Sequence, residues 1–110
     1  MSIQDLHSQD FSACLNSTFH VEAPDGAILP LQLVGVIEHA LSPRTEHFTL
    51  SFVGPLTPIL PQAIHKMKHD KLGEFSLFVV ALGPEGDAMT YEVIFNRLRP
   101  KTAESASPKQ

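Results

Sequence analysis

The side chains in this chain that are best suited to chemistry are six histidines and a single cysteine. His65 and His69 have the spacing of two metal ligands on one helix face, but they lie in residues 62–69, where apolar and polar side chains alternate as in a strand. An extended chain rises about 3.3 Å per residue, so the two histidines would stand about 13 Å apart, whereas a zinc–nitrogen bond is about 2 Å. One ion cannot bind both side chains in that geometry.

The remaining reactive side chains form no recognised motif. His20, His39 and His47 could approach one another across strands, but no spacing requires it. Cys14 alone can build neither a thiolate site nor an intrachain disulfide. The chain has no Gly-x-Ser-x-Gly nucleophile motif and no glycine-rich phosphate loop followed by lysine. We therefore predict no catalytic residue, no metal site and no cofactor, and a protein that is not an enzyme.

A short helix is predicted at residues 8–15. Ser8 can cap its first turn, and Phe11, Cys14 and Leu15 have the i, i+3 and i+4 spacing that places them on one side. Because two helical turns are not stable alone in water, we expect this segment to pack as a lid on other elements. Cys14 is then a small buried apolar residue.

Alternating apolar and polar residues predict an antiparallel sheet for most of the chain. Six segments show the pattern, at residues 18–23, 28–39, 47–54, 62–69, 74–82 and 89–97. The alternation breaks near Gly35, which predicts a bulge or sharp bend of the kind that turns the corner of a small barrel. In the second half of the fifth segment both faces are apolar, so we expect both to be covered there.

The predicted fold class is all-β with one short N-terminal helix. Six strands joined in sequence form a meander, and closure into a small barrel, complete or nearly so, would remove the exposed edges. The predicted organisation is an N-terminal segment at residues 1–17, a barrel domain at 18–97 and a disordered polar tail at 98–110.

Two predicted loops provide candidate surfaces for interaction. The proline-rich residues 54–61 contain Leu56, Ile59 and Leu60, which either fold back as a plug of the core or form a contact patch. The acidic residues Glu85 and Asp87 are predicted at the tip of the loop before the last strand. These five residues are the candidate interaction surface.

Composition limits the remaining possibilities. A net charge of −4 disfavours a general nucleic-acid binder. The longest apolar run, at residues 77–82, is much shorter than the roughly 20 residues of a membrane helix, and residues 1–17 lack the features of a secretory signal. A single cysteine suits a reducing compartment, so we expect a cytoplasmic protein without nucleic-acid or membrane partners.

The order of several motifs resembles a known family. The motifs are Phe-x-Leu-x-Phe-x-Gly-Pro at residues 48–55, Leu-Pro-Gln at 60–62, Gly-Pro at 83–84 and Tyr-Glu-x-x-Phe-Asn at 91–96. Together they look like a small bacterial domain family of unknown function, over roughly residues 10–97. The resemblance implies one small all-β domain and no catalytic residue, and His65 departs from it by replacing a large or aromatic residue.

Two functions follow as hypotheses. The first is a protein-interaction or assembly module with a protein partner or a second copy, one version being an accessory of a larger bacterial or phage-tail-like particle. The alternative is a small-molecule binder that uses the mouth or interior of the barrel. Because a narrow barrel with seven phenylalanines is easily filled, the composition favours the module.

Overall fold

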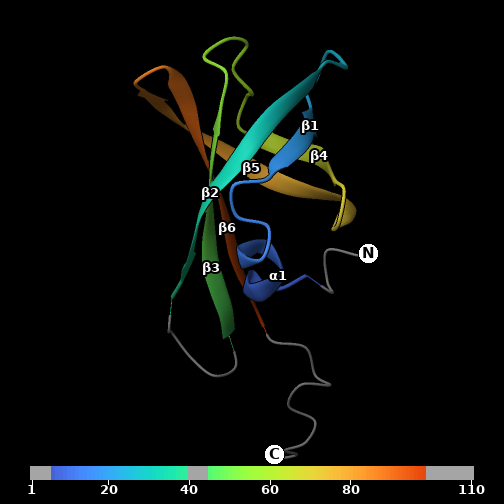
Figure 1. Cartoon of the computed structure of the whole chain (residues 1–110), viewed down its shortest axis with the longest axis vertical. Helices are drawn as coiled ribbons and strands as arrows, with labels where there is room; N and C mark the ends of the chain where they lie inside the picture. The colour runs from blue at the N-terminus through green and yellow to red at the C-terminus, as the bar shows by residue number, and fades with distance from the viewer. Residues whose placement is uncertain (1–5, 40–44, 99–110) are drawn as a thin grey trace, which may run out of the picture.

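The chain folds as a closed antiparallel β-barrel with a short helix at one mouth. The computed structural model describes residues 6–39 and 45–98. The elements are α1 (Ser8–Ser12), β1 (Thr18–Glu22), β2 (Ile28–Glu38), β3 (Thr45–Gly54), β4 (Ala63–His69), β5 (Gly73–Glu85) and β6 (Ala88–Leu98) (Figure 1). The predicted fold class is confirmed. Residues 40–44 and the predicted polar tail beyond residue 98 lie outside the described residues.

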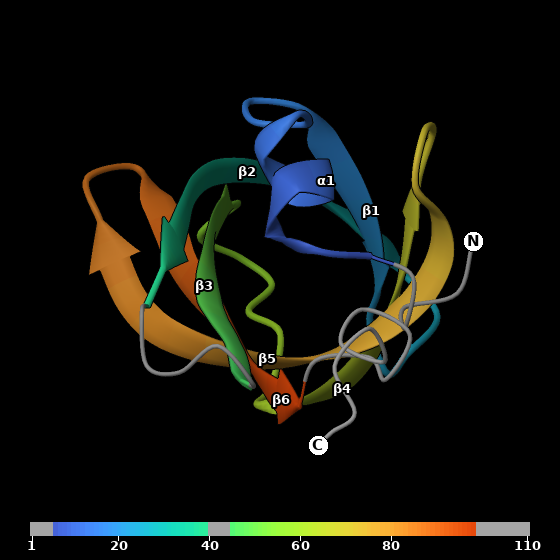
Figure 2. The ribbon, with the colours of Figure 1, turned by 90° about the horizontal axis from the view of Figure 1, so that it is seen from below.

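The strands follow one another around the ring in the order β1-β2-β3-β6-β5-β4. The longest ladder joins β3 to β6 over ten residue pairs, from Thr45↔Leu98 to Gly54↔Met89. The ring closes between β1 and β4 over only two pairs, His20↔Lys68 and Val21↔Met67. Viewed from below, the strands encircle α1, which lies beside β1 and β2 (Figure 2).

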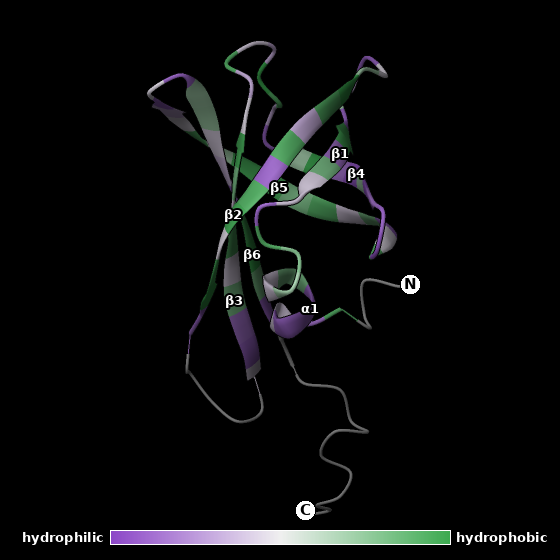
Figure 3. Cartoon of the chain, viewed as in Figure 1, coloured by the Kyte–Doolittle hydropathy of each residue, from purple (hydrophilic) through white to green (hydrophobic). Residues whose placement is uncertain are grey.

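Alternation of side chains sets the inner and outer faces of each strand. Successive strand residues point to opposite faces, and Figure 3 shows the strands banded with hydrophobic and hydrophilic residues. The inward positions form one core with Phe11 of α1, and its largest fully buried side chains are Tyr91, Phe11, Phe19, Phe48 and Phe52. The barrel interior is therefore filled by side chains.

Register shifts mark two places where the barrel wall bends. The pairing of β2 with β3 skips between Leu33 and Gly35, so Val34 is the extra residue of a bulge. This confirms the bulge predicted near Gly35. A second shift lies in the β5–β6 ladder between Ala81 and Gly83.

The helix is shorter than predicted. It ends at Ser12, and residues 13–16 form a turn in which Asn16 has a φ of +68°. Phe11 and Cys14 are buried as expected, but Leu15 is 41% exposed because the chain leaves the helix before Leu15 can face the core. The Ser8 hydroxyl does not cap the helix. It donates a hydrogen bond to Glu38 instead.

Candidate interaction surface

The proline-rich loop between β3 and β4 divides the residues predicted to act together. Leu60 is buried, and its backbone N–H donates a hydrogen bond to the Tyr91 hydroxyl oxygen at 3.0 Å. Leu56 and Ile59 are exposed. Leu60 is thus part of the core, and including it in the interaction surface was wrong. For this residue the other alternative holds, in which the loop folds back as a plug of the core.

The other predicted residues lie at the same end of the barrel. Glu85 and Asp87 are exposed on the β5–β6 hairpin, whose two-residue loop contains Gly86 at a φ of +64°. Figure 1 shows this hairpin and the loop after β3 together at the upper end. The structure therefore places Leu56, Ile59, Glu85 and Asp87 on the surface at one end of the barrel.

A second exposed apolar surface lies on the outer wall and was missed in the sequence. Ile64 on β4 pairs directly with Phe78 on β5, and their side chains are 70% and 49% exposed. Ile94 on β6 is also exposed, two residues beyond Glu92, which pairs with Val80. We call Ile64, Phe78 and Ile94 the outer-face cluster.

The sequence did contain a signal for this cluster. The outward positions of β5 include Phe78, Val80 and Leu82, and their apolar character led us to expect that both faces of β5 were covered. The structure shows that Phe78 and Leu82 are exposed in the single chain. The expectation of a covered face was therefore wrong for this chain taken alone.

Charged side chains lie beside the outer-face cluster. Lys68 Nζ is 3.1 Å from Glu74 Oε2, whereas Lys66 Nζ is 3.7 Å from Glu74 Oε1. The hydrogen bond from Lys68, together with the charges of both lysines, lowers the pKa of the Glu74 carboxyl. All three side chains are exposed, so these ion pairs contribute little to stability.

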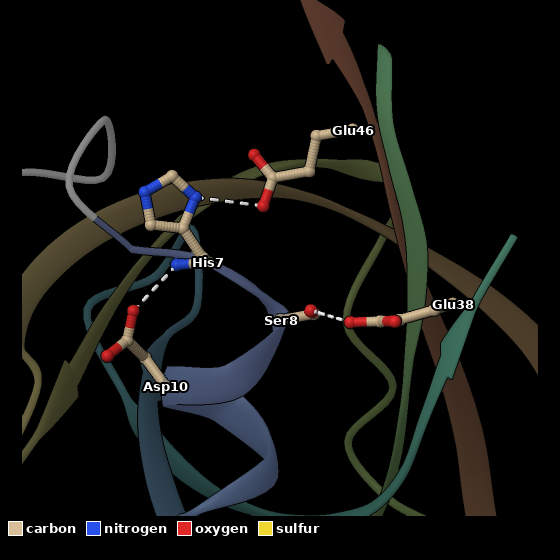
Figure 4. A network of polar contacts seen from close by, with 5 residues as sticks. All are labelled: His7, Ser8, Asp10, Glu38 and Glu46. Carbon is tan, nitrogen blue, oxygen red and sulfur yellow. Dashed lines mark hydrogen bonds and ion pairs between the residues drawn. The ribbon is translucent and has the colours of Figure 1, made fainter. Parts of the chain in front are cut away.

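A polar network fixes α1 at the lower mouth of the barrel (Figure 4). His7 Nδ1 lies 2.9 Å from Glu46 Oε2, and the Ser8 hydroxyl donates to Glu38. The backbone N–H of His7 donates to Asp10 Oδ2 at 2.8 Å, which satisfies one free donor at the start of the helix. Glu38 and Glu46 come from β2 and β3, so the network joins the helix to the barrel wall.

Two inward histidines of β4 serve the fold through different partners. His65 Nδ1 is 3.2 Å from the Glu22 carbonyl oxygen, and its Nε2 is 2.7 Å from the Pro61 carbonyl oxygen. His65 therefore bridges the end of β1 and the end of the proline-rich loop. This polar role accounts for a histidine at a position where the family resemblance implied an aromatic or other large residue.

The partners of His69 assign its tautomer. Its Nδ1 accepts hydrogen bonds from the backbone N–H groups of Lys71 and Leu72, at 3.0 and 3.3 Å. Its Nε2–H therefore donates to the Ser17 hydroxyl at 2.8 Å. Burial lowers the pKa of the His69 imidazole below 6.5; Asp70 opposes the shift, while Lys71 adds to it.

The structure brings His39 and His47 together, with ring centroids 4.5 Å apart. His39 Nε2 also lies 3.0 Å from the Thr49 hydroxyl oxygen. His20 lies elsewhere, on β1 opposite Pro30. Within residues 6–39 and 45–98, no three potential ligands among histidine, cysteine, aspartate and glutamate gather closely enough to hold a metal ion.

Two shallow grooves lie outside the barrel, near its closing seam. One has a volume of about 340 Å³ and includes His20, Lys66 and Glu74 in its lining. The other, of about 450 Å³, lies between the β1–β2 turn and the first half of β4. Neither groove is lined by Phe48, Phe52 or Tyr91, the residues that would line a pocket inside the barrel.

Comparison with known families places the chain. A family model described as "Domain of unknown function (DUF6916)" matches residues 6–95. The chain belongs to this family. The DUF6916 match begins just before α1 and ends in β6, so it includes both the mouth network and the outer-face cluster. The curated proteins and the solved structures searched contained no match to the chain.

The DUF6916 domain also lacks a membrane-spanning helix in its described part. Between residues 6 and 98, leaving aside 40–44, no helix is long and apolar enough to cross a bilayer.

Proposed function

We propose that this DUF6916 domain is a non-catalytic interaction module that binds a protein partner through its outer-face cluster. One version of this proposal is an assembly accessory of a larger particle, as we expected from the sequence. Support comes from where the chain puts its apolar side chains. The interior is filled, and further large apolar residues remain outside, where only another molecule can cover them.

The observation that carries the proposal is the exposed pair of Ile64 and Phe78. The two residues are cross-strand neighbours, so their side chains form continuous apolar surface rather than isolated exposed residues. An aromatic residue beside an aliphatic one is typical of the centre of a protein interface. Lys66 and Glu74 form a charged border to this apolar surface. Lys66 pairs with Ser76, two residues before Phe78, and Glu74 lies two residues before Ser76 on the same strand.

The interior gives no support to the alternative of a small-molecule binder. Phe48, Phe52 and Tyr91 are fully buried, and Phe19 packs edge-on against Phe52 with ring centroids 5.3 Å apart. A ligand inside the barrel would have to displace these rings. The mouth near α1 is occupied by Phe11, which packs against four other phenylalanines.

Three of the side chains suited to catalysis, His65, His69 and Cys14, are held inside the fold, which supports a non-catalytic role. Both ring nitrogens of His65 and of His69 are engaged with other groups of the fold. Cys14 is buried in the core. A reacting group has to reach its substrate, and none of these three side chains projects from the surface.

Affinity capture from native lysate, with cross-linking and mass spectrometry, tests the proposal. We expect the wild-type chain to retain a specific protein partner, and Phe78→Asp to lose it. Ile37→Asp is the control, because Ile37 is also a large apolar residue, 54% exposed, but pairs with Thr49 on the β2–β3 side of the ring, away from β5. Ile59→Asp tests the loop surface. Retention of the partner by Phe78→Asp, or its loss only with Ile59→Asp, would contradict use of the outer face.

A further inference from the structure

The outer face around Phe78 carries opposite charges on opposite sides of an apolar centre. Lys66 lies on β4 opposite Ser76, two residues before Phe78 along β5. Glu92 lies on β6 opposite Val80, two residues after Phe78. Since β4 and β6 flank β5 on different sides, the basic and acidic side chains are diagonal to each other across Phe78.

The two charges are equally distant from Phe78. Two residues of strand span about 6.6 Å and neighbouring strands lie about 4.8 Å apart, so each Cα is about 8 Å from that of Phe78. With these spacings, Phe78 is the midpoint of the line from Lys66 to Glu92 in the plane of the sheet. Ile64 lies level with Phe78 on β4. On the other side, Ile94 follows Glu92 by two residues along β6, beyond the last pair of the β5–β6 ladder.

This arrangement is complementary to itself. Consider a two-fold axis that lies in the plane of the interface and passes Phe78, perpendicular to the line from Lys66 to Glu92. Rotation about this axis exchanges the two ends of that line. It places Lys66 of each copy over Glu92 of the other and brings the two Phe78 rings together. Such isologous contacts are the commonest way in which identical chains associate.

We propose that the outer face of β5 binds a second copy of this chain, forming a two-fold dimer centred on Phe78. This proposal rests on the proposed function and names the partner at the outer-face cluster. The charges are available for it. Lys66 has only a distant contact with Glu74, which Lys68 holds more closely, and Glu92 makes no ion pair among the described residues.

The two kinds of contact have different roles in the dimer. Burial of the outer-face cluster from both copies supplies the affinity, because apolar area is removed from water twice over. The Lys66–Glu92 pairs fix the relative orientation, since any other rotation of the two faces would bring like charges together or leave the charges unpaired. Two such pairs form in each dimer because the axis repeats the contact.

Sedimentation equilibrium of the purified chain over a concentration series tests this proposal. We expect a monomer–dimer equilibrium that Phe78→Asp abolishes. Lys66→Glu and Glu92→Lys should each weaken dimerisation by at least about tenfold, because each places like charges together in two contacts. The combined variant Lys66→Glu with Glu92→Lys should return to within about threefold of wild type, because every pair is then restored with reversed sign.

The control for the charge variants is Glu85→Lys, which changes the net charge as Glu92→Lys does but lies at the exposed hairpin tip. It should leave dimerisation unchanged. Circular dichroism confirms that each variant is folded, and the charge variants alter only outward-facing side chains, so they decide the matter even if Phe78→Asp does not fold.

Two results would overturn the proposal. A chain that remains monomeric at every concentration would exclude the dimer, and a combined variant no better than the single ones would exclude the pairing of Lys66 with Glu92. The proposed function fails separately. If the chain is monomeric but Phe78→Asp still loses a captured partner, the outer face binds a different protein and only self-association is wrong.

Discussion

The hydroxyl oxygen of Tyr91 accepts a hydrogen bond from the backbone N–H of Leu60 at 3.0 Å, and both residues are buried. This contact fixes the end of the proline-rich loop to the inner face of β6. Tyr91→Phe removes the acceptor without changing the ring, and leaves the Leu60 N–H without its partner. We expect the free energy of unfolding to fall by about 1–3 kcal/mol in urea denaturation.

Hydrogen exchange distinguishes this effect from a general loss of stability. The Leu60 amide should exchange faster in Tyr91→Phe than in wild type, beyond the change seen for amides in the β3–β6 ladder. Equal protection of Leu60 in both proteins would mean that the bond contributes nothing to holding the loop.

Gly54 approaches β2 so closely that no larger residue fits without displacement. A Cβ atom at this position would lie 2.3 Å from Leu31 Cδ2 and 3.4 Å from the Pro30 carbonyl oxygen. Because Leu31 is fully buried, it has little room to move, and we expect Gly54→Ala to cost about 1–3 kcal/mol of stability. Gly35→Ala is the matched control: its nearest neighbour, Ser51 Cβ, would be at 3.5 Å. Similar thermal unfolding of the two variants would contradict this account.

Phe11 contributes most of the contact between α1 and the core. It is fully buried, and its ring centroid lies 5.6 Å from that of Phe95 and 6.0 Å from that of Phe48. Phe11→Ala should therefore destabilise the chain by about 3–5 kcal/mol in chemical denaturation. Leu15→Ala, in the exposed turn after α1, should stay within about 0.5 kcal/mol of wild type. A small effect of Phe11→Ala would show that the barrel is stable without its helix.

The lowered pKa of His69 predicts how stability changes with pH. As the pH falls below 6.5, the unfolded chain takes up a proton at this side chain before the folded chain does, because the folded-state pKa is lower. Stability from His69 is therefore complete above 6.5 and is lost as the pH falls from 6.5 through the folded-state pKa. Denaturation midpoints measured across this range should fall less steeply for His69→Gln than for wild type.

His39→Gln is the control for the pH experiment, because it also removes one histidine, and His39 is not among the groups whose charges shift the pKa of His69. It should keep most of the wild-type slope. If the two variants lose the same part of the pH dependence, the burial of His69 is not its source.

Strand alternation predicted the barrel because apolar residues recur at every second position along the strands and face the core. Phe19, Val21, Leu31, Phe48 and Met67 are all fully or almost fully buried, as the two-residue period requires. The bulge near Gly35 was predictable for the same reason: an extra residue interrupts the period. These features depend on neighbours in sequence, so one sequence is sufficient to find them.

The candidate site was less predictable because its contacts join distant segments. The pairs of His7 with Glu46 and of Ser8 with Glu38 are separated by 39 and 30 residues, and no local pattern links them. Thr49 has an outward position in the alternation of β3, yet it is buried and bonded to His39. Phe78 was ambiguous because an apolar residue on the outer face has the same sequence pattern whether it is covered or exposed.

The short seam between β1 and β4 has a consequence for how the barrel assembles and opens. The hairpins β1–β2, β4–β5 and β5–β6 join residues close in sequence, whereas the seam joins His20 to Lys68 and is supported by two residue pairs. Bringing such distant residues together costs chain entropy, and few contacts reward it. The ring is therefore expected to close last at this seam during folding. In the native state, we expect local opening to begin with separation of the β1–β2 hairpin from β4.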